Sequence, residues 1–261
     1  MADAATKSPF TRQEVTVNGI KTEILSAGKG DPLVFWHGAG TVGGWDFTLP
    51  WAEKFRVIIP YHPGWGGSDD APKMTAIQDY VMHYLDLFDA LGLEKFHLVG
   101  LSMGGWMAAT FATQHAHRLR RLALVAPAGL RVPEFPTADI FRIKPEELLG
   151  HLAVDITPLI PHLPKDPNDI DFIVGQYREQ TSFARLAWER IWDPKLATYL
   201  HRIKVPTQLV WGEQDRIVPF GQAQTWSRLI PNAKVWSVRG AGHLVLNEKP
   251  EAARAVLDFL V

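Results

Sequence analysis

The sequence predicts an α/β fold, with a mostly parallel twisted sheet, helices on both of its faces and one helical segment inserted late in the chain. Two observations predict it. From about residue 33 onward, short apolar runs that suit strands alternate with helix-length segments. In addition, several polar motifs each follow directly on such an apolar run, where the carboxyl edge of a parallel sheet gathers functional groups.

The first elements are expected to be strands. Runs at 14–18 and 20–26 lead into a strand at 33–36, and another strand is expected at 56–60. A helix at 75–91 follows, since apolar residues recur there at helical spacing until Gly92: Ile77, Tyr80, Val81, Tyr84, Leu85 and Phe88. The apolar stripe of this helix should face the sheet.

The next strand, at 96–99, is followed by a helix-like run at 106–112, with Ser102 between them. A serine turned sharply between a strand and a helix has a strained backbone and an exposed hydroxyl. The residues two positions away on each side must lack bulk, as Gly100 and Gly104 do. We therefore expect Ser102 to be an activated nucleophile.

After a strand at 122–126, the next convincing strand does not begin until Thr207. Residues 129–200 hold eight of the nineteen prolines of the chain, so we expect short helices broken by proline. A helix at 220–230, a strand at 235–238 and a helix at 251–260 complete the chain. The sequence thus predicts a core of residues 1–128 and 201–261, interrupted by an insertion of residues 129–200.

Two further polar residues follow late strands and should meet Ser102 at the same edge of the sheet. His243 follows the strand at 235–238, and it would take the proton of the serine as general base. Asp215 follows the strand at 207–210, and it would orient the imidazole. The local rivals of Asp215 for this role are Glu213 and Asp193.

A glycine-rich turn, His37-Gly38-Ala39-Gly40, follows the strand at 33–36. Backbone N–H groups in such a turn can stabilise the negative charge that grows on a carbonyl oxygen under attack. We expect Met103, directly after the serine, and Ala39 to supply the two donors of this oxyanion hole, with Gly40 as the alternative second donor. His37 itself is interpreted as a buried structural imidazole.

Composition excludes several classes of function. The net charge of −1 provides no basic surface for nucleic acid or for an anionic membrane. The absence of cysteine excludes disulfides, thiolate metal sites and a cysteine nucleophile. No metal-ligand spacing, phosphate loop or dinucleotide fingerprint occurs, so no metal and no cofactor is expected. Without an apolar run at residues 1–9 or a long apolar stretch elsewhere, we expect a cytoplasmic protein with no membrane insertion.

From about Val15 to Leu260, the chain resembles the α/β-hydrolase family. Five motifs carry the resemblance: HGAG at 37–40, HPGWGGSD at 62–69, GLSMGG at 100–105, WGEQDRIVP at 211–219 and GAGHL at 240–244. The resemblance implies the α/β-hydrolase fold, a catalytic triad, and a cap over the active site formed by the insertion after the sixth strand. Some relatives place the acid after the preceding strand, which would favour Asp139 or Asp155.

The resemblance and the residues together imply a serine esterase. Its substrates would be carboxylic esters of small to medium, largely apolar molecules, cleaved through an acyl-enzyme intermediate that water then hydrolyses. Its partners would be such a small-molecule ester and water. The candidate substrate-binding residues are Trp45, Trp106, Phe135, Ile140, Trp188, Val218 and Leu244.

Three alternatives stay open. Hydrolases that split a carbon–carbon bond in ring-cleavage products are similar in size and cap placement, but they usually carry asparagine at the position of Leu101 and tryptophan at that of Leu244. Arg178 or Arg190 could still clamp a substrate carboxylate. Cofactor-free haloperoxidases and perhydrolases share the triad, and a ligand receptor on the same fold would turn its ester over slowly.

Overall fold

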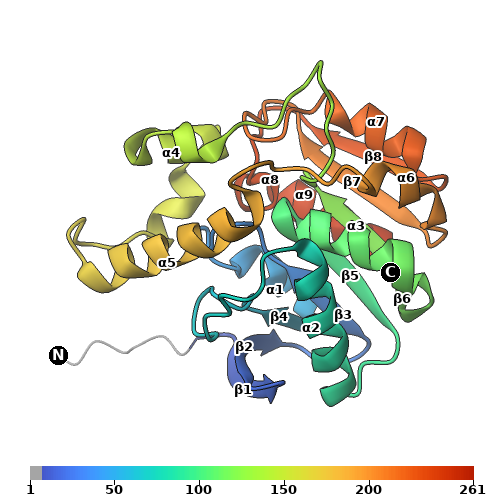
Figure 1. The fold of residues 1–261 in the computed structure, drawn as a ribbon, viewed down its shortest axis with the longest axis horizontal. Coiled ribbons are helices and arrows are strands. Elements are labelled where there is room, and N and C mark those ends of the chain that lie inside the picture. The colour runs from blue at the N-terminus through green and yellow to red at the C-terminus, as the bar shows by residue number, and fades with distance from the viewer. Residues whose placement is uncertain (1–7) are drawn as a thin grey trace.

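A computed structural model describes residues 8–261 and shows eight strands in one sheet (Figure 1). The strand order is β1-β2-β4-β3-β5-β6-β7-β8. β2 pairs antiparallel with both β1 and β4, and all other pairs are parallel. The strands are β1 (Thr11–Val17), β2 (Ile20–Ala27), β3 (Pro32–Trp36), β4 (Arg56–Pro60), β5 (Phe96–Leu101), β6 (Leu119–Val125), β7 (Thr207–Gly212) and β8 (Ala233–Val238).

Helices cover both faces of the sheet because the central strands are apolar on both sides. Along β3, Val34 and Trp36 face one layer, whereas Leu33 and Phe35 face the other. The first layer contains α2 (Ile77–Ala90), α3 (Met103–His115) and α7 (Gln222–Leu229). The second contains α1 (Leu49–Ala52), α8 (Val245–Glu248) and α9 (Pro250–Leu260). This is the predicted α/β architecture, with the predicted strands and helices displaced by only a few residues at their ends.

The inserted segment, defined as residues 129–200, contains α4 (Pro145–Leu152), α5 (Ile170–Ala187) and α6 (Leu196–Tyr199), with two 3₁₀ helices, Ile140–Arg142 and Thr157–His162. The expectation of short, proline-broken helices is wrong for α5. It is 18 residues long, and its sequence contains no proline. Seven of the eight prolines of the segment lie before it and Pro194 lies after it. The Asp169 carboxylate caps its first turn by accepting a hydrogen bond from Phe172 N.

The two ends of the inserted segment meet at the core. Gly129 and Trp192 form an isolated parallel bridge, and Asp193 N donates to Gly129 O at 2.9 Å. Residues 130–191 therefore leave and return at one place, and Figure 1 shows α4 and α5 to one side of the layered core. Leu196 and Leu200, after this return, are buried in the same cluster as α3, so the last part of the predicted insertion packs on the core.

Residues 1–7, on which part of the expectation about a targeting segment rests, lie outside the described residues. Among the helices of residues 8–261, none combines the length and the apolar character that crossing a bilayer requires.

Candidate active site

Ser102 forms the turn between β5 and α3, and its backbone has φ +55° and ψ −116°. L-residues rarely adopt positive φ, so the surrounding structure must hold this turn. Ser102 N donates to Val125 O of β6 at 2.9 Å, and Ser102 O accepts from Trp106 N and Ala128 N. The neighbouring strand and the first turn of α3 thus fix the serine from both sides.

The two flanking glycines are required by the close approach of backbone. A Cβ added at Gly104 would lie 2.2 Å from Trp36 O, and one added at Gly100 would lie 2.4 Å from Gly104 O. Both distances are shorter than van der Waals contact. The structure therefore explains physically why the sequence has glycine two residues before and two residues after Ser102.

His243 and Asp215 are hydrogen-bonded to each other in a buried environment. His243 Nδ1 lies 2.8 Å from Asp215 Oδ2, and both residues are almost fully buried. The other carboxylate oxygen of Asp215 accepts from the backbone N–H groups of Ile217 and Val218 at 2.8 and 2.9 Å. With Asp215 ionised, Nδ1 carries a proton and Nε2 is left as the acceptor, which is the tautomer a general base needs.

Gln214 joins the loops that carry this pair, a role that the sequence analysis did not identify. Its side-chain oxygen accepts from Gly240 N and Ala241 N, at 2.7 and 3.1 Å, and its backbone N–H donates to Ala241 O. The one feature of the sequence that could have indicated this role is that Gln214 directly precedes Asp215 in the WGEQD motif. A Cβ at Gly212 would lie 2.1 Å from Gly242 O, so the two loops pack backbone against backbone.

Ser102 and His243 line the same cavity, of about 390 Å³. The hydrogen bonds of residues 8–261 include none between Ser102 Oγ and His243 Nε2, and Nε2 has no other partner there. Catalytic hydrogen bonds of this kind are often long before substrate binds. The wall also includes Gly38, Ala39, Gly40, Val42, Gly43, Leu101, Ile140, Phe141, Ile143, Pro145, Leu148, Leu152, Gln176, Glu179, Gln180, Phe183, Trp188, Ile191, Ile217 and Leu244.

The turn after β3 lies against the serine. A Cβ added at Gly38 would be 3.3 Å from Ser102 Cβ. Gly38 O accepts from His37 Nδ1 at 2.7 Å, so the Ala39 N–H in the same trans peptide points the opposite way. Neither Ala39 N nor Gly40 N donates to any group within residues 8–261, and Met103 is the first residue of α3, where N–H groups lack helical acceptors.

His37 is fully buried and has a structural setting. Its Nε2 accepts from His62 N at 3.1 Å, while its Nδ1 donates to Gly38 O. Burial lowers the pKa of His37 to about 3, with the bond to Gly38 opposing that shift. The imidazole is therefore neutral at ordinary pH and holds the glycine-rich turn in shape.

The rival carboxylates have other partners. Glu213 accepts from Ser237 Oγ, and Asp193 accepts from Lys195 N. Asp139 and Asp155 each accept from a backbone N–H two residues further on. Within the described chain, Asp215 is the carboxylate hydrogen-bonded to His243.

Three of the seven candidate substrate-binding residues, Ile140, Trp188 and Leu244, line the cavity. The other four lie outside its wall. Trp45 packs on Phe35 and donates to Tyr61 OH, and the ring of Trp106 lies against Gly129. Phe135 lies over Gly221 and is exposed, whereas Val218 is fully buried. Core packing and cavity lining use the same apolar residue types, so the sequence did not separate them.

Glu179 of α5 is the one carboxylate in the wall of the cavity, and none of the lining residues is lysine or arginine. Burial raises the pKa of the Glu179 carboxyl, and hydrogen bonds from Thr41 oppose that rise.

The two arginines that could clamp a substrate carboxylate have other partners. Arg178 donates to Gly66 O, and Arg190 lies over the ring of Trp192, 5.6 Å from its centroid. Neither arginine lines the cavity, and no group of three or more His, Asp or Glu side chains in residues 8–261 could hold a metal ion.

Comparison with known proteins adds a family and two kinds of relative. The model of the alpha/beta hydrolase family matches residues 33–256. Monoacylglycerol lipase ABHD6 of Homo sapiens is 34% identical in a match that covers 78% of this chain and 66% of that protein, so the chain spans just under two thirds of this relative. The 2-hydroxy-6-oxo-6-(2'-aminophenyl)hexa-2,4-dienoic acid hydrolase of Metapseudomonas resinovorans is 29% identical in a match that covers 97% of this chain and 92% of that protein.

Solved structures show the same architecture. A bacterial membrane phospholipase A superposes with a TM-score of 0.83 at 24% identity, covering 97% of this chain and 86% of the other. CarC, a serine hydrolase involved in carbazole degradation, superposes with a TM-score of 0.78 at 25% identity, covering 96% of this chain and 98% of the other. At such identities, the phospholipase structure indicates a shared fold alone.

Proposed function

This chain belongs to the α/β-hydrolase family, and from that premise we propose that it is a serine hydrolase of carboxylic esters with uncharged, largely apolar acyl groups. Ser102 is the nucleophile, His243 the general base and acid, and Asp215 the residue that orients His243. The inserted segment acts as a cap over the cavity. The observation that carries the proposal is the cavity itself, in which Ser102 and His243 face a mostly apolar wall without a cationic side chain.

The proposed reaction has two steps. Ser102 Oγ attacks the ester carbonyl carbon while His243 Nε2 takes its proton, and the resulting oxyanion accepts hydrogen bonds from Ala39 N and Met103 N. The intermediate collapses when His243 returns the proton to the leaving alcohol oxygen. Water, deprotonated by the same imidazole, then attacks the acyl-enzyme, which releases the acid and restores Ser102.

The charge of the cavity favours esters over ring-cleavage products. The relatives that hydrolyse dienoic acids have anionic substrates, as their names state. A substrate carboxylate in this cavity would meet Glu179 and would find no lysine or arginine among the lining residues. Carbon–carbon hydrolysis is nevertheless the second candidate, because those relatives match nearly the full length of the chain.

The test is a substrate panel scored by kcat/KM. It contains p-nitrophenyl esters of increasing acyl length, a monoacylglycerol, and 2-hydroxy-6-oxohexa-2,4-dienoates. We expect multiple turnover of the uncharged esters and a Ser102→Ala variant that is slower by at least about 10³-fold. Ser227→Ala, which removes a serine hydroxyl from a partly exposed position of α7, is the matched control and should keep wild-type activity.

Each other outcome points to a named alternative. Turnover of the dienoates but not of esters would establish carbon–carbon hydrolysis, and a single burst followed by arrest would indicate a receptor. Activity that requires hydrogen peroxide would indicate a perhydrolase or haloperoxidase. Undiminished ester turnover by Ser102→Ala would reject the nucleophile assignment.

A further inference from the structure

Both carboxylate oxygens of Glu179 accept hydrogen bonds from Thr41 of the core, and the backbone of Gly66 also stabilises this carboxylate. Oε1 accepts from Thr41 Oγ1 at 2.7 Å, and Oε2 accepts from Thr41 N at 3.1 Å. The two residues are 138 positions apart in sequence, one directly after the glycine-rich turn that follows β3 and the other in α5 of the inserted segment. Glu179 is only 5% exposed, so water competes little for these bonds.

Thr41 directly follows the segment that carries the candidate oxyanion donors, Ala39 and Gly40. Upstream, this segment is fixed by Trp65 Nε1, which donates to Ala39 O at 2.8 Å. Downstream, packing restrains it little, because a Cβ added at Gly40 would meet no atom within 4 Å. The bonds from Thr41 to Glu179 therefore tie the downstream end of the donor segment to α5, next to a 3.3 Å bond from Gly44 N to Thr41 O within the loop and a bond from Asn247 to Gly43 O.

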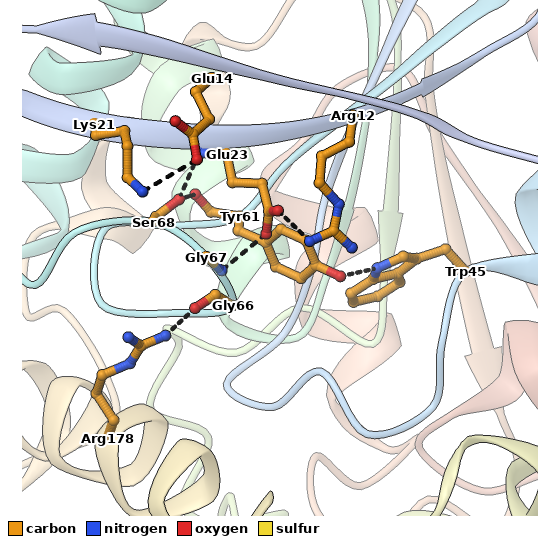
Figure 2. Close-up of polar contacts among 10 residues, drawn as sticks. All are labelled: Arg12, Glu14, Lys21, Glu23, Trp45, Tyr61, Gly66, Gly67, Ser68 and Arg178. Carbon is orange, nitrogen blue, oxygen red and sulfur yellow. Dashed lines mark hydrogen bonds and ion pairs between the residues drawn. The ribbon is translucent and has the colours of Figure 1, made fainter. Parts of the chain in front are cut away.

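Glu179 can act as a fixed anchor because α5 is itself docked on the loop at 62–70. Arg185 makes a bidentate ion pair with Asp70, at 2.5 and 2.9 Å, and Ser182 Oγ donates to Gly64 O. Positions 178, 182 and 185 share one helix face, and Arg178 donates to Gly66 O, as Figure 2 shows.

The loop that receives α5 is in turn tied to the sheet. In Figure 2, the Glu23 carboxylate of β2 accepts from Gly67 N and from Arg12, and Ser68 Oγ lies within hydrogen-bond distance of two backbone groups, of Tyr61 and Glu23. Ser68 Oγ donates to Tyr61 O at 2.8 Å and accepts from Glu23 N at 2.9 Å. A continuous set of hydrogen bonds thus runs from the sheet, through the loop at 62–70 and α5, to Thr41.

From this geometry we infer that Glu179 is a positioning residue: the inserted segment supplies the carboxylate that fixes Thr41 and so sets the Ala39–Gly40 backbone for the oxyanion. The inference rests on the proposed role of Ser102 as nucleophile. It means that the inserted segment completes the oxyanion hole in addition to covering the cavity. A misplaced donor weakens the transition state far more than the bound substrate, so loss of Glu179 should lower kcat with little change in KM.

The experiment compares five variants: Glu179→Gln, Thr41→Val, their combination, Thr41→Ser, and Asp171→Asn as the control. Asp171→Asn removes a carboxylate from the exposed first turn of the same helix. One readout is the rate at which a fluorophosphonate labels Ser102, because that reaction develops charge on a phosphoryl oxygen and needs no knowledge of the substrate. The other is the kcat and KM of a p-nitrophenyl ester, with folding checked by circular dichroism and the thermal midpoint.

We expect Glu179→Gln to slow labelling and to lower kcat by about 10- to 100-fold, with KM changed less than about threefold. Thr41→Val should have a smaller effect in the same direction, and the double variant should resemble Glu179→Gln because both act through one contact. Thr41→Ser, which keeps the hydroxyl, should retain the wild-type rate. Asp171→Asn should also match the wild type.

Wild-type labelling by a folded Glu179→Gln protein would overturn the inference, as would effects of the two single variants that simply multiply. A Glu179→Gln protein that fails to fold leaves Thr41→Val and Thr41→Ser to decide, and equal rates for these two would also overturn it. Failure of the proposed function looks different. A wild-type protein labelled at Ser102 that turns over no ester would refute the ester assignment alone, and absence of labelling would refute the nucleophile.

Discussion

The backbone of Ser102 lies in a conformation that costs about 1–3 kcal/mol for a residue with a side chain. That strain is held by three backbone hydrogen bonds and by the absence of side chains at Gly100 and Gly104. The position of Ser102 at the cavity is thus a product of packing on both sides of the turn. The same packing makes the flanking glycines intolerant of even one methyl group.

Gly104→Ala should destabilise the protein by at least about 2 kcal/mol, because its Cβ would overlap the backbone oxygen of Trp36, which cannot rotate away. Urea unfolding measures this free energy. Gly150→Ala is the matched control: Gly150 lies inside α4 with nothing within 4 Å of an added Cβ, so alanine should stabilise by about 0.5–1 kcal/mol. A Gly104→Ala protein as stable as the wild type would contradict the steric argument.

Among the elements, α4 and the histidine loop are joined by a second buried carboxylate. Glu248 of α8 accepts from Gly242 N through Oε1, and from Val154 N and Asp155 N through Oε2, at 2.8 to 3.0 Å. Leu244 N also donates to Leu152 O at the end of α4. The inserted segment therefore contacts the loop of His243 as directly as it contacts the glycine-rich turn.

Glu248→Gln should loosen this junction, since an amide in place of the carboxylate cannot accept from all three N–H groups through equivalent charged oxygens. We expect faster hydrogen exchange at the amides of Val154 and Asp155, by about 10-fold or more, and a lower thermal midpoint. Glu251→Gln, a change of the same kind in the first turn of α9, should alter neither. Unchanged exchange at Val154 and Asp155 would show that the carboxylate does not hold the junction.

Elements marked by a local pattern were predictable from sequence. The strand at 56–60 is a short apolar run, the helix at 75–91 has a clear apolar period, and Ser102 has its flanking glycines, so each is predicted at or near its observed place. The length of α5 is not predicted, because the prolines before it favour short helices and the expectation was extended to the whole insertion.

Contacts between distant segments were not predictable from sequence. Nothing near Glu179 indicates that its partner is Thr41, and nothing near Glu248 indicates Val154, because these contacts depend on how the inserted segment docks. For the same reason, Trp45 and Trp106 were candidates for the cavity until the layers were known. Their types match cavity-lining residues, and only the packing assigns them elsewhere.

At the scale of the whole molecule, four of the histidines buried within residues 8–261 have lowered pKa values. Burial lowers the pKa of His37 to about 3 and the pKa values of His83 and His97 to about 4, and that of His62 is also lowered well below its usual range. In the unfolded chain these groups titrate near 6.5. Below that pH the unfolded state binds protons that the folded state does not, so folding stability falls as the pH falls.

The urea midpoint should therefore be constant above about pH 7 and should decrease steadily from about pH 6.5 to pH 4.5. Each histidine contributes at most about 1.4 kcal/mol per pH unit within this window. His97→Leu is the variant of choice, because His97 Nδ1 has no hydrogen-bond partner within the described residues. It should give a shallower pH dependence, and a slope equal to that of the wild type would contradict the contribution of this histidine.

The bridge between Gly129 and Trp192 brings the two chain ends of residues 130–191 together at one place on the core, which is the arrangement that lets a module be exchanged by grafting. A transplanted module of any length could be joined to the core at the Gly129–Trp192 bridge. It would restore full activity and stability only if it also brought a carboxylate for Thr41 and two backbone N–H groups for Glu248. The activity of chimeras between members of this family should thus depend on whether these few polar contacts are kept, more than on the overall shape of the module.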